Sequence, residues 1–497
     1  MTISGKEYMN RIDHLKSDIW LDGQQIAGKV SKHPAFRGAI KSKAQLFDMQ
    51  NDPVFPVLRS ILTFISPQIE KNVNFSYQQP KTKDDLLFRK KATELWARTN
   101  FGLLGRSPDY VNTGMMVLAA SHKIFAAKDK KFGDHILRSY ENAMEQDLTF
   151  THTFINPQVN RSISYLEDSY SEENIAAKVI GENHEGIIIQ GARLLATQGG
   201  ITDEVLVLPA GGNFIEEAYI YGFTIPSNTE GLKFICRESF VNDDDSSFNY
   251  PLGSRFEEMD SIVVFDHVLV PWEKVFLYKD LNIAHRFFTE ANFNTMLLFQ
   301  AVVRMIVKTE FILGLAESII EAINIGEYQH IQDKVSEIIA TLEIMKGLHL
   351  SSQVNARLDK WGMIVGDDDA RCKAFTCGYS LLPKNIPPIG VEILQLLGGS
   401  GLILLPTENS FASSVRSYID TYLQGANSTD STAEDRVMLF RIVWDLCMSP
   451  FGTRQTHYER FFFGDPVPPF VWQWAFIMDI PRTNIQRGSK SFLRQIN

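Results

Sequence analysis

The sequence predicts an α+β protein in which a helical region is followed by a strand-rich region and then by a second helical region. Three observations predict this order: apolar residues recur with the helical period before about residue 148, short strand-like runs fill residues 150–277, and long helical periods return afterwards. We therefore expect an N-terminal helical domain over residues 1–148, a central β domain over residues 149–277, and a C-terminal helical bundle with a tail over residues 278–497.

The helical period of the first region is clearest over Asp84–Arg98. Within that range Phe88, Ala92, Leu95 and Trp96 fall on one face, which is typical of a helix with one buried side. Pro and Gly residues around positions 51–53 and 105–108 separate the helices from one another.

Short runs of β-branched and aromatic residues fill the central region, with Gly, Asn and Asp between them. Because no long helix separates these runs, they favour an antiparallel sheet or barrel over a Rossmann unit. The expected strands are Ala177–Ile180, Glu185–Ala196, Glu204–Leu208, Glu216–Thr224, Leu232–Cys236 and Ser261–Leu269.

Two long helices are expected in the third region, over Leu297–Asn324 and Ile331–Leu358, and they are typical of a helical bundle. The longest apolar stretch, Met296–Ile325, contains charged residues such as Arg304 and Lys308. A bilayer would penalise those charges heavily, so we expect a buried helix rather than a membrane span.

The charge balance excludes two classes of partner. The chain carries 59 acidic and 49 basic side chains, a formal net charge of −10, so it lacks the basic face that nucleic acids or anionic lipids require. Its 4 cysteines are too few and too scattered for a disulfide framework, a zinc site or an iron–sulfur cluster, and we expect no metal. The first 20 residues contain no apolar leader, which favours the reducing cytoplasm.

Several common catalytic motifs are absent from the sequence. It contains no P-loop, no G-x-G-x-x-G after a strand, no H-E-x-x-H and no G-x-S-x-G. Nucleotide hydrolysis, Rossmann-type dinucleotide binding, zinc proteolysis and serine hydrolysis are therefore disfavoured.

Candidate site residues stand in segments that are otherwise apolar or rich in Gly and Pro. In Gly105–Tyr110 (GRSPDY), Arg106 and Tyr110 are four residues apart and lie on one face if a helix begins at Pro108. Arg106 could hold an anionic oxygen while Tyr110 hydrogen-bonds the same group. The alternative is a helix cap with a surface arginine.

Three further segments carry similar candidates. In THTFINP, His152 could take a proton near neutral pH, or it could be a structural histidine with all its hydrogen bonds made. Arg161, which follows this segment, could likewise be functional or structural. In ATQGG, Thr197 could approach a flat ligand closely, or the segment could be a plain turn. In FGTR, Arg454 could pair with a phosphate while Gly452 permits close approach.

Taken together and in this order, these segments resemble the oxygenase component of two-component, reduced-flavin-dependent phenol monooxygenases, the 4-hydroxyphenylacetate 3-monooxygenase family. The resemblance covers nearly the whole chain. The matching segments are GKEY (Gly5–Tyr8), HPAFR (His33–Arg37), GRSPDY, HTFINP, YPLGSRF (Tyr250–Phe256), DHVLVPWEKV (Asp266–Val275) and FGTR.

The resemblance implies an acyl-CoA dehydrogenase-like fold with a central antiparallel β-barrel and a C-terminal four-helix bundle, usually as a homotetramer. It implies that FADH2, supplied by a separate NAD(P)H-dependent flavin reductase, binds between the β domain and the bundle. O2 then adds at flavin C4a to give a hydroperoxide, and the distal oxygen goes to the ring carbon ortho to a phenol. No metal is required.

The resemblance also implies roles for individual residues. Arg106, Tyr110 and His152 match the phenol-binding and activating set, which fits the chemistry because oxygen transfer is easier onto a phenolate. Thr197 matches the threonine near flavin N5. His152 also matches a flavin contact. Two segments match further flavin contacts: Gln158, Val159, Asn160 and Arg161, and Phe451, Gly452, Thr453 and Arg454. Arg161 and Arg454 are the implied phosphate partners.

The sequence departs from the family where the substrate pocket would close. Neither Gln198–Pro209 nor the loop with Asp243–Asp245 can be matched, so 4-hydroxyphenylacetate, a tyrosine-like phenol, a chlorophenol and a biosynthetic intermediate all stay open as substrates. A 4-hydroxybutyryl-CoA dehydratase is disfavoured because no cysteine precedes Cys236. An acyl-CoA dehydrogenase gives the phenol set no role, and a catalytically silent scaffold protein of the same fold is a further alternative.

Overall fold

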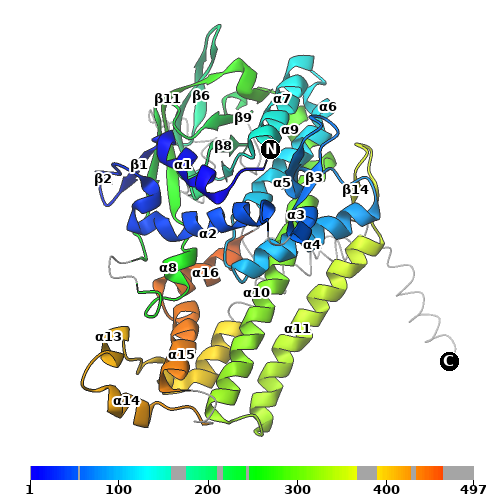
Figure 1. Cartoon of the computed structure of the whole chain (residues 1–497). Helices are drawn as coiled ribbons and strands as arrows, with labels where there is room; N and C mark the ends of the chain where they lie inside the picture. Colours follow the sequence, from blue (N-terminus) through cyan, green and yellow to red (C-terminus); the bar gives the residue numbers. More distant parts are fainter. Residues whose placement is uncertain are drawn as a thin grey trace, which may run out of the picture.

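The computed structural model of the chain describes residues 2–53, 56–157, 175–209, 216–241, 246–366, 389–426 and 432–462. Figure 1 shows the strands and the N-terminal helices in its upper half and two long helices running below them. The mixed α+β class predicted from the sequence is confirmed. The predicted tail, residues 464–497, and the Asp243–Asp245 loop lie outside the described residues.

The N-terminal region is mainly helical, and its longer helices begin at capping residues. Thr82 and Asp85 form a capping box in which each side chain accepts from the other residue's backbone N–H, and this fixes the start of the helix predicted over Asp84–Arg98. The helices are α1 (Gly5–Leu15), α2 (Pro34–Gln50), α3 (Pro56–Leu62), α4 (Lys83–Thr99), α5 (Pro108–Ala120), α6 (His122–Phe125) and α7 (Lys130–Gln146).

The strands of this and the central region form two larger sheets and a small hairpin. The six-stranded sheet has the order β2-β1-β10-β11-β7-β6, the four-stranded sheet has the order β12-β9-β8-β5, and β3 pairs with β4. The strands are β1 (Asp18–Leu21), β2 (Gln24–Gln25), β3 (Thr63–Ile65), β4 (Asn72–Asn74), β5 (Phe150–Thr153), β6 (Lys178–Glu182), β7 (Gly186–Thr197), β8 (Glu204–Val207), β9 (Tyr221–Pro226), β10 (Leu232–Cys236), β11 (Asp260–Pro271) and β12 (Val275–Tyr278).

The pairing differs from a purely antiparallel sheet in two places. The β1 strand pairs with β10 in parallel, and β5 pairs with β8 in parallel. Long connections supply these pairs, because β1 comes from the helical N-terminal region and β5 directly follows α7. Part of the predicted strand Glu216–Thr224 is instead the 3-10 turn Glu217–Tyr219. The described strands form separate sheets, so a closed barrel stays a prediction.

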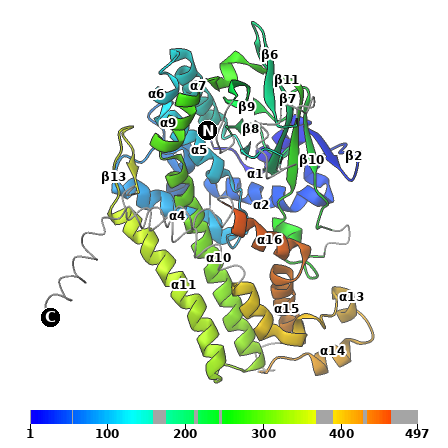
Figure 2. The same ribbon diagram turned by 180° about the vertical axis from the view of Figure 1, so that it is seen from behind.

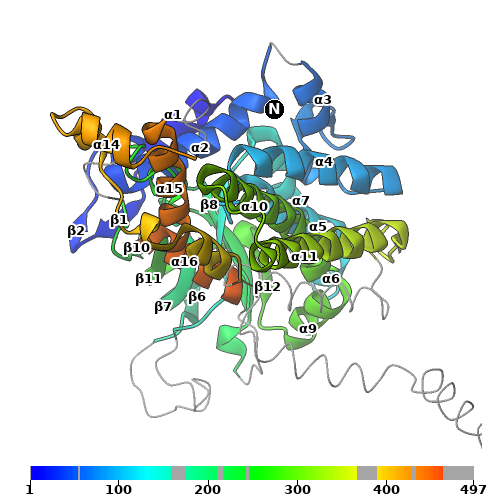
Figure 3. The ribbon, with the colours of Figure 1, turned by 90° about the horizontal axis from the view of Figure 1, so that it is seen from below.

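The C-terminal region is helical, and its longest helix is buried without interruption from Met296 to Thr309. The long apolar stretch, predicted from the sequence to be a buried helix, forms most of α10. This helix packs against α11 and α15 (Figures 2 and 3). Among the described helices, none is long and apolar enough to cross a membrane. The elements are α8 (Gly253–Phe256), α9 (Leu281–Glu290), α10 (Phe293–Ile323), α11 (Gln329–Val354), β13 (Arg357–Leu358), β14 (Ile364–Val365), α13 (Glu408–Phe411), α14 (Arg416–Tyr422), α15 (Ala433–Cys447) and α16 (Pro450–Phe461).

Two large apolar cores meet next to the start of α5. The first core joins the N-terminal helices to both sheets and includes Tyr110, whereas the second joins α10, α11, α15 and α16 and includes Leu103 and Leu104. The loop of residues 105–107 therefore runs from one core to the other. Polar side chains in this loop are held between two packed bodies, which restricts their motion.

An ion cluster fastens α16 to α10 inside the second core. Glu459 accepts two hydrogen bonds from Arg304, at 2.6 and 2.8 Å, and one from Lys308 at 3.1 Å. All three side chains are at most 2% exposed. Burial alone would raise the pKa of Glu459, but the adjacent Arg304 and Lys308 outweigh it and lower the pKa to about 2.

We predict that Glu459→Gln destabilises the protein by about 3–5 kcal/mol, because it leaves two buried cations without their carboxylate. Urea unfolding at neutral pH measures this loss. Asp420→Asn is the control: it breaks an ion pair to Arg416 whose side chains are 43% and 46% exposed, and we expect less than about 1 kcal/mol.

The lowered pKa of Glu459 also fixes the sign of a pH effect. The stabilisation is present above its ordinary value of 4.5 and is lost as the pH falls toward 2. The difference in unfolding free energy between the wild type and Glu459→Gln should therefore shrink in acid. A difference that is small at neutral pH, or that grows in acid, would contradict this account.

Candidate active site

Arg106 and Tyr110 lie one turn apart where α5 begins. Pro108 occupies the first turn of α5, and the preceding Ser107 makes no capping bond with its side chain. Its hydroxyl instead donates to Asp109 at 2.5 Å. The Arg106 guanidinium lies over the Tyr110 ring, with 4.5 Å between its central carbon and the ring centroid. The two side chains thus lie together, as expected from their spacing. Ser107 does occupy the N-cap position of α5, but Arg106 is half-buried and is not a surface arginine.

Aromatic side chains of α16 and of the residue that follows it complete the surroundings of this guanidinium. The Arg106 central carbon is 4.6 Å from the Phe462 ring centroid and 5.3 Å from that of Tyr458. A side chain at Gly105 would collide with the Tyr458 ring, so this close approach requires glycine. No carboxylate pairs with the Arg106 side chain among the described residues, and its Nε is buried without a hydrogen-bond partner there.

His152 lies beside Tyr110 on β5. The two ring centroids are 5.7 Å apart, and the imidazole is 8% exposed. Its Nδ1 is buried and has no hydrogen-bond partner in the described parts of the chain. Burial lowers the pKa of His152 well below its ordinary value, and the positive charge of Arg106 lowers it further. His152 is therefore a neutral imidazole that can accept a proton or a hydrogen bond.

Thr197 ends β7 with its hydroxyl turned toward the start of β11. The hydroxyl donates to Asp260 Oδ1 at 2.7 Å, and Arg454 of α16 donates to both oxygens of the same carboxylate, at 2.6 and 2.9 Å. Burial would raise the pKa of Asp260, but Arg454 and then Arg237 outweigh it and hold it at about 2. The ionised Asp260 only accepts, so the oxygen of Thr197 keeps its lone pairs for another donor.

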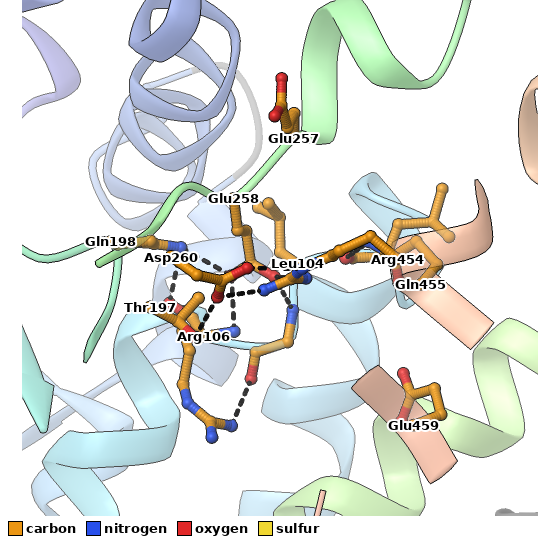
Figure 4. A network of polar contacts seen from close by, with 12 residues as sticks. Leu104, Arg106, Thr197, Gln198, Glu257, Glu258, Asp260, Arg454, Gln455 and Glu459 are labelled. Atoms are coloured by element: carbon orange, nitrogen blue, oxygen red, sulfur yellow. Dashed lines mark hydrogen bonds and ion pairs between the residues drawn. The ribbon is translucent and has the colours of Figure 1, made fainter. Parts of the chain in front are cut away.

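Glu258 joins this group to the Arg106 loop (Figure 4). Its carboxylate accepts the backbone N–H of Gly105 at 2.8 Å and that of Arg106 at 2.7 Å. It also accepts from the amide of Gln198, at 2.7 Å, and lies 3.6 Å from Arg454 Nη1. Segments that are far apart in the sequence therefore converge on one buried carboxylate.

Of the remaining predicted flavin contacts, those within the described residues make none of the hydrogen bonds around Arg106 and Asp260. Phe451 and Gly452 are buried at the corner between α15 and α16, where a side chain at Gly452 would collide with the Leu446 carbonyl. Thr453 is exposed, and its hydroxyl donates to the Ser449 carbonyl at 3.0 Å. The other predicted contacts lie outside the described residues: Gln158, Val159, Asn160 and Arg161.

Several residues of the site were not among the sequence candidates. Glu258 and Asp260 precede an apolar strand, and two acidic residues at the start of a buried strand are unusual enough to be a usable signal. Tyr458 and Phe462 lie four and eight residues after Arg454, so the helical period places all three on neighbouring turns of one face.

The unsatisfied polar atoms fit a phenol and a flavin. The Tyr110 hydroxyl makes no hydrogen bond to any described residue, and His152 Nδ1 and Arg106 Nε are buried and unpaired. A phenolic oxygen provides both the donor and the acceptor that such a set requires. In the turn after β7, Gln198 Oε1 and the Thr197 oxygen are acceptors suited to the N–H groups of a reduced isoalloxazine.

Comparisons with known proteins identify the family of the chain. The family model described as 4-hydroxyphenylacetate 3-hydroxylase N terminal matches residues 4–277, and its C-terminal counterpart matches residues 284–471. A Bacillus subtilis protein named "Probable 4-hydroxyphenylacetate 3-monooxygenase" is 50% identical, over 94% of this chain and 93% of its own length. The 4-hydroxyphenylacetate 3-monooxygenase oxygenase component of a Geobacillus species is 42% identical, over 93% of this chain and 91% of its own.

A solved structure supports the same assignment. The crystal structure of the oxygenase component of 4-hydroxyphenylacetate 3-monooxygenase in complex with FAD and 4-hydroxyphenylacetate superposes with a TM-score of 0.88 and 35% identity, covering 99% of this chain and 98% of that one. The chain belongs to the 4-hydroxyphenylacetate 3-hydroxylase family. It is a flavin-dependent aromatic monooxygenase that uses FAD and O2, and the family predicted from the sequence is confirmed.

We predict that the His152 ring stays neutral from about pH 8 down to about pH 6, since its pKa is lowered well below the ordinary 6.5. NMR of protein with 13C-labelled histidine, with the signal assigned by its loss in His152→Asn, measures this. Arg106→Met should shift the titration upward because it removes a positive charge. Protonation at the ordinary value in the wild type would contradict the burial of His152.

Proposed function

We propose that this protein hydroxylates 4-hydroxyphenylacetate, or a closely similar para-substituted phenol, at the ring carbon ortho to the hydroxyl group. The observation that carries the proposal is the cluster of Arg106, Tyr110 and His152, three side chains with unused hydrogen-bonding capacity that face one another. The relatives named for 4-hydroxyphenylacetate and the related complex with that compound support this choice of substrate.

The three side chains have complementary roles toward the phenolic oxygen. Burial raises the pKa of Tyr110 and outweighs Arg106 and Arg304, so its hydroxyl stays protonated and can donate. His152 is neutral and accepts a hydrogen bond from the phenolic O–H, which weakens that bond as negative charge develops on the oxygen. Arg106, which has no carboxylate partner among the described residues, stabilises the negative charge left on the oxygen. A phenolate ring is richer in electrons than the phenol and accepts an oxygen atom more readily.

The flavin is held, in this proposal, on the far side of Arg106. When bound, reduced FAD activates O2 and supplies the oxygen atom that reaches the ring. Thr197 donates to Asp260, so its oxygen accepts a hydrogen bond from an N–H of the reduced flavin. Arg454 donates to Asp260 through Nε and Nη2, while its Nη1 makes no hydrogen bond in the described chain, so a flavin phosphate contact through Nη1 stays a proposal. Gln158, Asn160 and Arg161 stay proposed flavin contacts.

The reduced flavin comes from a second protein in this proposal. The Geobacillus relative is named as an oxygenase component, which supports a separate NAD(P)H-dependent flavin reductase as partner. A cytoplasmic location belongs to the same proposal, because NAD(P)H supplies the electrons. The acyl-CoA dehydrogenase-like details, a closed barrel and a four-helix bundle, also stay proposals, supported by the two twisted sheets and by the packing of α10 with α11 and α15.

A homotetramer is the proposed assembly. Its support is an apolar stripe on the exposed side of α11, formed by Ile339, Leu350 and Val354, which are 41%, 55% and 60% exposed. Their spacing of eleven and four residues places them on one face of the helix. Neighbouring large apolar residues at this exposure mark an interface more often than a free surface.

The function is tested by supplying purified protein with chemically reduced FAD, O2 and a panel of phenols. We expect 4-hydroxyphenylacetate to yield the 3,4-dihydroxy product, detected by chromatography and coupled to O2 uptake. His152→Ala should slow hydroxylation by about 10²-fold or more while flavin affinity changes little, because the lost group acts on the phenol proton.

His135→Asn provides the control for that variant. His135 is also buried, at 6% exposure, but its Nδ1 pairs with the Val275 carbonyl at 2.7 Å, away from the cluster. We expect near wild-type turnover from it. Flavin oxidation without product from every phenol would contradict the proposed function, and equal loss of flavin binding and hydroxylation in His152→Ala would assign His152 to the flavin alone.

The assembly is tested by light scattering coupled to size-exclusion chromatography. We predict the mass of four chains of 56.4 kDa each. Leu350→Lys combined with Val354→Lys should shift the population toward smaller species, because it places charges in a buried apolar contact. A monomeric wild type would contradict the proposed tetramer.

A further inference from the structure

We infer that Glu258 is a positioning residue that sets the affinity for the phenol by holding the backbone of Arg106. This inference rests on the proposed function, since it concerns the same pocket. Glu258 makes no hydrogen bond to Tyr110 or His152 and acts through the loop that carries Arg106 and through Gln198 of the turn after β7.

The contacts of Glu258 are unusually specific for a buried carboxylate. Its side chain is fully buried, and burying an ionised carboxylate is costly unless hydrogen bonds replace its water. Oε2 accepts the N–H of Gly105, and Oε1 accepts both the N–H of Arg106 and the amide of Gln198. Because Glu258 binds two successive backbone N–H groups, it fixes the orientation of the loop relative to β11. In this orientation the Arg106 side chain lies over the Tyr110 ring.

The backbone of Glu258 is itself anchored. Arg237 donates to the Glu258 carbonyl at 2.9 Å, and it also binds Asp260 at 3.2 Å. The hydrogen bonds of Glu258 therefore transmit a fixed position from the sheet to the Arg106 loop. A mobile surface carboxylate could not do this.

The turn after β7 supplies an independent observation. Gln198 adopts a left-handed backbone, with φ of 64°, which non-glycine residues rarely do. Its amide donates to Glu258 Oε1 and to the Arg106 carbonyl, at 2.7 and 3.2 Å. Such a conformation persists only where surrounding contacts enforce it, and these are the contacts that join the turn to the Arg106 loop. The same turn begins with Thr197, so Glu258 also fixes the distance between the phenol side and the proposed flavin side.

The neighbouring Glu257 is a natural control. It is also buried, at 2% exposure, but it accepts from Arg237 at 2.8 Å and from the Phe240 backbone at 2.8 Å. In Figure 4 it lies apart from the contacts around Arg106. Two adjacent buried glutamates therefore differ in whether they touch the Arg106 loop.

The test compares Glu258→Gln with Glu257→Gln in the full chain saturated with oxidised FAD, where no turnover occurs. Calorimetry measures the Kd of 4-hydroxyphenylacetate, and circular dichroism checks the fold. In Glu258→Gln one amide hydrogen must face a backbone N–H, so the loop shifts, and we expect a Kd about tenfold higher than in the wild type. Glu257→Gln should bind within about twofold of the wild type.

Kinetics provide a second measurement that loss of stability alone would not reproduce. With reduced FAD and O2, and with the concentration of 4-hydroxyphenylacetate varied, Glu258→Gln should raise KM more than it lowers kcat, because Arg106, Tyr110 and His152 are all still present. If Glu258→Gln does not fold, Gln198→Met replaces it: this variant keeps the side-chain length and removes both amide contacts, and we expect a smaller rise in Kd, about threefold.

An unchanged Kd in the folded Glu258→Gln, or in Gln198→Met when it replaces that variant, would overturn the inference and leave the proposed function intact. An equal rise in both glutamate variants would also overturn it, because the effect would then come from losing any buried carboxylate. A wild type that binds no phenol at all would instead overturn the proposed function and, with it, this inference.

Discussion

The pair of carboxylates before and at the start of β11 is the constraint on which the site depends. Glu258 binds the backbone that carries Arg106, and Asp260 binds Thr197 and Arg454. The Glu258 side chain is fully buried and that of Asp260 is 16% exposed, so both carboxylates need partners in place of most of their water. Their pairing requires that the Arg106 loop, the turn after β7 and α16 all converge. The arrangement of the helices and sheets around them is the means by which those three segments meet.

This pairing also determines where positive charge stays available. Arg454 pairs with Asp260 through Nε and Nη2 and lies 3.6 Å from Glu258 through Nη1. The Arg106 side chain instead faces the rings of Tyr110, Tyr458 and Phe462 and meets no carboxylate in the described chain. Aromatic faces stabilise a guanidinium more weakly than a carboxylate does, so Arg106 keeps most of its capacity to bind an anion. A ligand that becomes negatively charged next to Arg106 and His152 can therefore form the ion pair that no carboxylate of the described chain forms with Arg106.

The sequence predicted what depends on local spacing. The helical period located α4 to within a residue at each end, and the four-residue separation of Arg106 and Tyr110 predicted their shared face. It could not predict pairings between distant segments: β1 joins β10 in parallel across more than two hundred residues, and Asp260 meets Arg454 across 194. The sequence therefore predicted Arg454 as a phosphate partner without indicating its ion pair with Asp260, because that pairing is visible only after folding. Glu258 was missed for the same reason.

The central claim is that Arg106, Tyr110 and His152 meet at one phenolic oxygen. The crystal structure of this protein with FAD and 4-hydroxyphenylacetate tests it most directly. The account predicts the phenolic oxygen within hydrogen-bonding distance of the Tyr110 hydroxyl and the His152 ring, beside the Arg106 guanidinium, with the ring carbon ortho to it facing the flavin. A phenol bound with its hydroxyl directed elsewhere, or a flavin on the opposite side of β7 from Thr197, would contradict it.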